Sequence, residues 1–122
     1  MDNTISHSEL VIMKLLWEKS PLTASEINEL IDRNWRKATV KTLINRLLNK
    51  QVIGFEKQGR AYYYHPNISK SDYLKAQNKS FLNELYDGNI ANMMAAFTSH
   101  ESLSDDEIQD IKSLISKLEE GS

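Results

Sequence analysis

The sequence contains no cysteine and no long apolar run. Without cysteine there is no disulfide, and no thiolate for an iron–sulfur cluster or a thiolate metal site, which fits a cytoplasmic protein. No stretch approaches the roughly 18 apolar residues of a membrane-spanning helix, so no membrane insertion is expected. The opening residues, MDNTISHSEL, carry an acid and no basic segment, so no secretory signal peptide is expected either.

Histidine and glycine are scarce and scattered. The three histidines, His7, His65 and His100, lie far apart, and no pair has the spacing of metal ligands on one helix. The four glycines form no phosphate-binding loop. No nucleophile is placed beside a base by any motif. The sequence therefore predicts no metal, no cofactor and no enzymatic activity.

Charge is distributed unevenly along the chain. Residues 1–66 hold 10 Lys and Arg against 7 Asp and Glu, a net charge of +3, and residues 67–122 hold 5 against 10, a net charge of −5. Residues 33–60 hold eight basic residues and one acid, Glu56. A basic patch confined to one segment of an acidic chain indicates a polyanionic partner for that segment.

Two capping boxes predict where the first two helices begin, because an N-cap hydroxyl and a Glu three residues later each satisfy a free amide. The first is Ser6 with Glu9, and the second is Thr23 with Glu26. A very short strand is expected between these helices at Leu22. The faces expected to be buried hold Ile12, Leu15 and Leu16 in the first helix and Ile27, Leu30 and Ile31 in the second.

The stretch WRKATVKTLINRLLNK, residues 35–50, predicts a third helix with two contrasting faces. Its apolar residues recur at i, i+3, i+4, i+7 and i+8, and these are Val40, Leu43, Ile44, Leu47 and Leu48. The other side carries polar and basic residues, among them Thr39, Lys41, Thr42, Asn45 and Arg46. Any surface helix has a polar face, but an ordinary one mixes charges of both signs. Here no acid occurs in residues 33–55.

A β-hairpin with a basic tip is expected directly after this helix. Residues 52–57 and 61–65 are rich in β-branched and aromatic residues, Gln58-Gly59-Arg60 forms the turn between them, and Pro66 ends the second strand. The order helix, short strand, helix, helix, hairpin predicts a winged helix–turn–helix over residues 1–70. The residues expected to contact DNA are Lys37, Thr39, Lys41, Thr42, Asn45, Arg46, Lys50 and Arg60. Of these, Thr42 and Arg46 are expected to reach bases, and Lys37, Lys50 and Arg60 to hold phosphates.

Residues 71–122 are expected to form a helical dimerisation domain after a linker at residues 67–70. Three helical segments are predicted: residues 72–86, a segment around residues 90–97, and a helix opened by a third capping box, Ser104 with Glu107. About fifty residues in short helices bury little surface by themselves, so a second copy of the chain is the simplest partner. The apolar residues expected at that homodimer interface are Leu74, Phe81, Leu85, Ile90, Met93, Met94, Phe97, Ile108, Ile111, Ile115 and Leu118.

Four segments together resemble the penicillinase repressor family, the BlaI and MecI type of dimeric winged-helix repressor. They are SHSELVIMKLLWEKSPLTASEI, the pattern W-x-x-x-T-V-K-T-L-I-N-R-L-x-x-K, YYYHP, and SFLNELYDGNIANMMAAFTSHESLSDDEIQDIKSLI. The resemblance covers nearly the whole chain. Other winged-helix families share the layout but not the string T-V-K-T-L-I-N-R-L.

The resemblance implies a homodimer that binds a palindromic operator of TACA/TGTA type and represses resistance genes, β-lactamase genes in particular. It also implies release by a transmembrane β-lactam sensor with a metalloprotease domain, and the equivalent cleaved bond here is Ala96–Phe97. The family has Asn before that Phe, and it often has Ser-Pro where this chain has Arg36-Lys37. A copper-responsive branch carries Cys-x-Cys, which this chain lacks. Two alternatives remain: a winged-helix module that binds another protein, and a repressor of this family released by a non-proteolytic signal.

Overall fold

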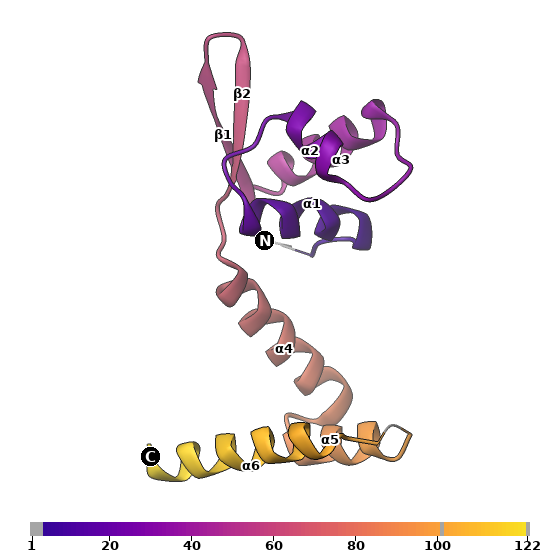
Figure 1. Ribbon diagram of the computed structural model, residues 1–122, viewed down its shortest axis with the longest axis vertical. Coiled ribbons are helices and arrows are strands. Elements are labelled where there is room, and N and C mark those ends of the chain that lie inside the picture. The colour runs from indigo at the N-terminus through magenta and orange to yellow at the C-terminus, as the bar shows by residue number, and fades with distance from the viewer. Residues whose placement is uncertain (1–3, 101, 122) are drawn as a thin grey trace. The chain divides into compact units, whose positions relative to one another are not determined.

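The computed structural model of the protein, shown in Figure 1, describes residues 4–100 and 102–121. The chain divides into two compact units, residues 1–75 and 76–122, and the division falls inside helix α4 (Lys70–Tyr86). Helices and a single two-stranded hairpin make up the secondary structure of the described residues. This confirms the predicted fold class, a mainly α winged helix–turn–helix followed by three helices.

The N-terminal unit begins with the two helices that the capping boxes predicted. The Ser6 hydroxyl accepts from the Glu9 amide at 3.1 Å, and the Glu9 carboxylate accepts from the Ser6 amide at 2.8 Å. Thr23 and Glu26 form the same pair of bonds, at 3.1 and 2.9 Å. The elements of this unit are α1 (His7–Glu18), α2 (Ala24–Leu30), α3 (Lys37–Asn49), β1 (Ile53–Gln58) and β2 (Ala61–Pro66), before the start of α4.

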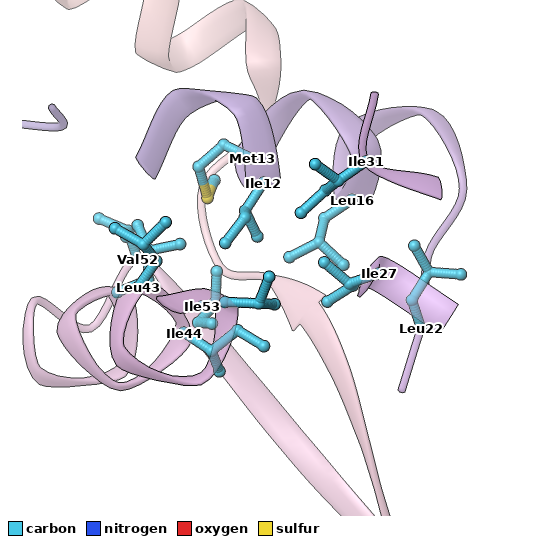
Figure 2. Packing of buried hydrophobic residues seen from close by; sticks show 12 residues of the cluster. Ile12, Met13, Leu16, Leu22, Ile27, Ile31, Leu43, Ile44, Val52 and Ile53 are labelled. Carbon is cyan, nitrogen blue, oxygen red and sulfur yellow. The ribbon is translucent and has the colours of Figure 1, made fainter. Parts of the chain in front are cut away.

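The core of this unit lies between α1, α2, α3 and the base of the hairpin. Figure 2 shows Ile12, Met13 and Leu16 directed from α1 toward the side chains of the other elements. The buried cluster comprises Ile12, Met13, Leu16, Leu22, Ile27, Ile31, Val40, Leu43, Ile44, Leu47, Val52 and Ile53. Burial on this scale fixes how α3 is rotated about its own axis, and therefore which residues it exposes.

Two residues expected in the core are less buried than predicted. Leu15 is only half-buried, and Met13 takes the fully buried position in α1. Leu30 is 39% exposed, whereas Ile31 is buried. The reason is that α2 ends at Leu30 and Ile31 has an extended backbone, so the helical periodicity no longer applies there.

The hairpin is antiparallel, and Gln58 pairs with Ala61. Its turn is therefore the dipeptide Gly59-Arg60, and the expectation that Gln58 also belongs to the turn is wrong. Gly59 has a φ of 64°, a left-handed conformation that glycine adopts without strain. At the base of the hairpin, Leu22 forms the predicted short strand as a bridge to Tyr64. The hairpin projects away from the helices of this unit (Figure 1).

The C-terminal unit contains the end of α4 together with α5 (Ile90–Thr98) and α6 (Asp105–Glu120). The predicted break at Asp87-Gly88 is confirmed, since both residues have positive φ angles, 51° and 79°. The third capping box, Ser104 with Glu107, is also formed. Neither α5 nor α6 has a buried residue in the single chain. In the described part of the chain no helix combines the length and apolar character needed to span a membrane.

The linker predicted at residues 67–70 is shorter than expected. Lys70 already belongs to α4, two residues before the predicted start at Asp72. The Ser69 hydroxyl accepts from the Asp72 amide at 3.0 Å and so caps the first turn. The following turn stays with the N-terminal unit, because Tyr73 is buried with its ring centroid 5.4 Å from that of Trp17.

Candidate nucleic-acid interface

The exposed face of α3 carries the residues predicted to contact DNA. Thr39, Lys41, Thr42, Asn45 and Arg46 are all exposed, and so is Lys37 in the first turn of the helix. The opposite face is buried in the core through Val40, Leu43, Ile44 and Leu47. Arg36 is the N-cap and makes no side-chain capping bond. We refer to the exposed face, defined by Thr39, Lys41, Thr42, Asn45 and Arg46, as the polar face of α3.

The Thr42 side chain forms a hydrogen bond within α3, which limits the groups it can present to a partner. Its hydroxyl donates to the Ala38 carbonyl one turn earlier, at 2.9 Å. The single hydroxyl proton is therefore in use, and the oxygen lone pairs and the methyl group remain. Those groups can accept a hydrogen bond or contact a thymine methyl.

A shallow cleft of about 510 Å³ brings the polar face of α3 together with the start of α1. Thr39, Thr42 and Arg46 line it from α3, and Trp35 lies just before that helix. Ser6 and Ser8 line it from the beginning of α1. Sequence reasoning did not select Ser8, because about thirty residues separate it from α3 and only the packing of α1 on α3 makes them neighbours. The Ser6 and Glu9 amides are already bonded in the capping box, so the serine hydroxyls are the groups that this edge offers to a phosphate.

Lys50, one of the predicted phosphate contacts, has partners within the chain. Its ammonium lies 2.6 Å from Oε1 of Glu9 and donates to the Thr4 carbonyl at 2.8 Å. Glu9 is buried, with 1% of its surface exposed. Burial raises the pKa of its carboxyl, but the hydrogen bonds from Lys50 and the Ser6 amide and the charge of Lys50 outweigh burial, so the pKa lies below its ordinary value. Lys50 thus has an intramolecular role that the sequence did not indicate.

The tip of the hairpin carries the remaining predicted contact. Arg60 is exposed in the two-residue turn. Lys57 adds a second positive charge close to the tip, with its ammonium 5.7 Å from the centre of the Tyr62 ring. The hairpin and α3 belong to the same compact unit, so both of them supply positive charge to that unit.

The residues predicted for dimerisation lie on α4, α5 and α6 and are largely uncovered in the single chain. Half-buried are Met93, Met94 and Ile111. Exposed are Leu74, Phe81, Leu85, Ile90, Phe97, Ile108, Ile115 and Leu118. Exposed apolar surface on this scale is typical of a face that another molecule covers. The bond Ala96–Phe97 lies inside α5, and both of its residues are exposed.

The N-terminal unit has three helices, a short bridge and a two-stranded hairpin, which place it in the winged helix–turn–helix class of proteins. The polar face of its third helix carries no acid. Residues 5–117 match the penicillinase repressor family. The chain therefore belongs to the penicillinase repressor family.

Its relatives include a penicillinase repressor and a methicillin resistance regulatory protein. The penicillinase repressor of Bacillus licheniformis is 33% identical over 113 residues, which cover 91% of this chain and 88% of the relative. The methicillin resistance regulatory protein MecI of Mammaliicoccus sciuri is 33% identical over 122 residues, covering 96% and 99%. A solved structure of the Bacillus licheniformis BlaI monomeric form in complex with the blaP half-operator has a TM-score of 0.50 and 38% identity. It covers 57% of this chain and 88% of that one.

Proposed function

We propose that this chain is a homodimeric transcriptional repressor that acts in the cytoplasm on promoters of resistance genes, β-lactamase genes foremost. Its operator is a palindrome of TACA/TGTA type. The observation that carries this proposal is the polar face of α3, which is free of acids and held outward by a buried opposite face. The similarity to BlaI, which was solved in complex with the blaP half-operator, supports duplex DNA as the partner.

Five residues of this interface have roles that follow from their chemistry. Arg46 is suited to the paired acceptors of guanine in the major groove, and Thr42 offers its lone pairs and methyl group to a base edge. Lys37 and Arg60 hold phosphates and set the register of the protein on the duplex. Ser8 extends the phosphate contacts to the start of α1. Lys50 is left out of this set, since its ammonium already binds Glu9 and the Thr4 carbonyl.

Dimerisation supplies the affinity that one small DNA-binding unit lacks. The exposed apolar residues of α4, α5 and α6 form the surface that a second copy covers, with Phe97 at 56% and Leu118 at 64% exposure in the single chain. Two units joined in this way bind two half-sites, because the second contact benefits from a high effective concentration. A twofold dimer matches a palindrome whose half-sites lie about one helical turn, roughly 34–36 Å, or a multiple of it apart.

Release of the operator follows from loss of dimerisation. Cleavage of Ala96–Phe97 by a transmembrane β-lactam sensor metalloprotease separates α6 from the rest of the chain. The effective concentration that links the two DNA-binding units is then lost, and each unit dissociates by itself. No change within the DNA-binding unit is required.

A binding titration tests the proposal. The full-length protein is titrated against a TACA/TGTA palindrome and a scrambled duplex at two salt concentrations. We expect a preference for the palindrome of about 1,000-fold or more near physiological salt. Equal binding to both duplexes with a steep loss at high salt would show that only phosphates are recognised. Binding to neither duplex would favour the alternative, a winged-helix module that binds another protein.

A further inference from the structure

A concave groove of about 570 Å³ lies where α2, α3 and the hairpin meet. Its volume falls within the range of small-molecule sites, roughly 300–1,000 Å³. Two of its aromatic side chains stay largely exposed, Phe55 at 49% and Tyr62 at 43%, with their rings edge to face at 5.0 Å. Its apolar walls are formed by Val40, Ile44, Leu48, Phe55, Tyr62 and Tyr64.

The polar groups of this groove are positive or neutral. Ser25 and Asn28 contribute from α2, and Lys37, Lys41 and Asn45 from α3. Among the described residues that line it, none is acidic. Burial, and to a smaller extent the neighbouring Tyr62, raises the pKa of Tyr64, so that this hydroxyl adds no negative charge at neutral pH. An apolar floor with two ammonium groups at its edge complements a ligand that is apolar at one end and anionic at the other.

We propose that this groove is an effector site for a small amphipathic anion, namely a carboxylate carried on an aromatic ring or a short hydrocarbon body. The apolar body lies against Ile44, Leu48 and Phe55, and the carboxylate binds the ammonium groups of Lys37 and Lys41. Lys37 is a proposed phosphate contact, and Lys41 and Asn45 lie on the polar face of α3. Binding therefore competes with the operator and releases it without cleavage of the chain. This regulatory consequence rests on the proposed function, whereas the ligand site itself does not.

Duplex DNA is a poorer occupant of the groove floor. Its backbone carries a charged phosphate at every nucleotide, and moving phosphates among six apolar side chains removes hydration that those side chains do not replace. A duplex is instead expected to contact the lysines at the edge, from the side of the polar face of α3. The two modes share the lysines but not the floor, which makes them separable by mutation.

The ligand site is tested on the full-length protein without DNA, with 2-naphthoate as the probe and its neutral analogue 2-naphthamide as the control. Titration calorimetry gives the affinities, and amide chemical shifts locate the binding. We expect saturable binding of 2-naphthoate with shift changes at Ser25, Lys41 and Phe55. The amide is expected to bind about tenfold or more weakly, because it lacks the charge-assisted hydrogen bonds.

Two variants and a matched control test whether the probe binds in this groove. Ser25→Trp adds a large side chain at an exposed groove position and is expected to weaken 2-naphthoate binding at least about tenfold. Leu30→Trp places the same side chain on α2 outside the groove and should leave binding unchanged. Lys41→Gln keeps the apolar walls but should reduce the preference for 2-naphthoate over the amide.

The regulatory step is tested by repeating the operator titration with 2-naphthoate present. Because coupling is reciprocal, the probe should weaken operator binding by the factor by which the operator weakens probe binding. Absence of saturable probe binding, or equal affinity for probe and amide, would overturn the inference. So would weaker operator binding by Ser25→Trp than by Leu30→Trp, which would place DNA in the groove. Probe binding without operator recognition would instead contradict the proposed function but would still support the ligand site.

Discussion

The ammonium of Lys50 and the carboxylate of Glu9 form an ion pair of 2.6 Å across 41 positions of the sequence. The same oxygen, Oε1 of Glu9, accepts from the Ser6 amide in the capping box of α1. One buried carboxylate therefore caps the first turn of α1 and also binds Lys50, the C-cap residue that follows α3. This bond connects the helix proposed to read DNA with the first element of the fold.

Replacing Glu9 with Gln is expected to destabilise the N-terminal unit by about 1–3 kcal/mol, because Lys50 loses its charged partner. Lys50 is about a third exposed and can be partly rehydrated, so the upper end of the range for buried pairs does not apply. Urea unfolding followed by circular dichroism measures the change. Glu26→Gln is the matched control, since Glu26 serves an equivalent capping box but is exposed. Equal losses in the two variants would contradict a special role for the pair.

The same pair predicts a pH dependence. The pKa of Glu9 lies below its ordinary value in the folded chain, whereas the unfolded chain keeps the ordinary value. The stabilisation from the ionised carboxylate is therefore complete above that unfolded value and is lost as the pH falls through the folded pKa. Unfolding free energies measured from neutral pH to below pH 4 should fall less steeply in Glu9→Gln than in the unchanged protein. Parallel pH profiles would show that Glu9 titrates normally.

Sequence patterns predict best the parts of the fold that depend on neighbouring residues. Each of the three capping boxes needs only two residues three positions apart, and all three are formed. The stripe of Val40, Leu43, Ile44 and Leu47 likewise follows from helical periodicity alone. That stripe alone suffices to identify the face of α3 that points outward.

The features that the sequence did not reveal depend on packing between distant segments. Glu9 has the pattern of an ordinary capping residue, and its pairing with Lys50 arises only when α1 packs on α3. The groove likewise requires α2, α3 and the hairpin to be in place. The exposure of Leu30 and the pairing of Gln58 depend on where α2 and β1 end, and element ends are the least certain part of a pattern.

Single substitutions on α3 separate sequence reading from phosphate binding. Arg46→Ala should weaken palindrome binding by about 1–3 kcal/mol while leaving scrambled DNA much less affected. Lys37→Ala should weaken both duplexes alike and reduce the salt slope by about one unit. Lys14→Ala, a lysine exposed on α1 beside Trp17, serves as the control and should change neither. Fluorescence anisotropy at several salt concentrations measures all three. A uniform loss in Arg46→Ala would assign Arg46 to the backbone.

The packing of Tyr73 on Trp17 predicts how far the chain can be truncated without destabilising the DNA-binding unit. A fragment of residues 1–75 keeps this contact and the bond from the Trp17 indole to the Ile68 carbonyl, 2.8 Å long. A fragment of residues 1–70 lacks Tyr73 and should be less stable by about 1–3 kcal/mol. Urea unfolding compares the two.

Both fragments should be monomeric in sedimentation experiments, because they lack α5, α6 and most of α4. They should bind the palindrome more weakly than the full chain, since the link between half-sites is lost. Operator affinity equal to that of the full chain would rule out dimerisation as the source of tight binding.

The position of Ala96–Phe97 inside α5 predicts that cleavage requires this helix to open first. The Ser99 hydroxyl donates to the Ala96 carbonyl at 2.7 Å, and the Asn89 side chain caps the helix by accepting from the Asn92 amide at 3.1 Å. Asn89→Ala removes that cap, which costs about 1 kcal/mol and populates the open form about fivefold more. When opening is fast, proteolysis follows the population of the open form, so cleavage by a β-lactam sensor metalloprotease should speed up by a similar factor.

Asn92→Ala places a better helix former in the same helix and should slow cleavage. Mass spectrometry of timed digests measures both rates. Equal rates in the two variants would show that opening of α5 does not limit cleavage, and an uncut bond in all of them would leave release to a signal other than proteolysis.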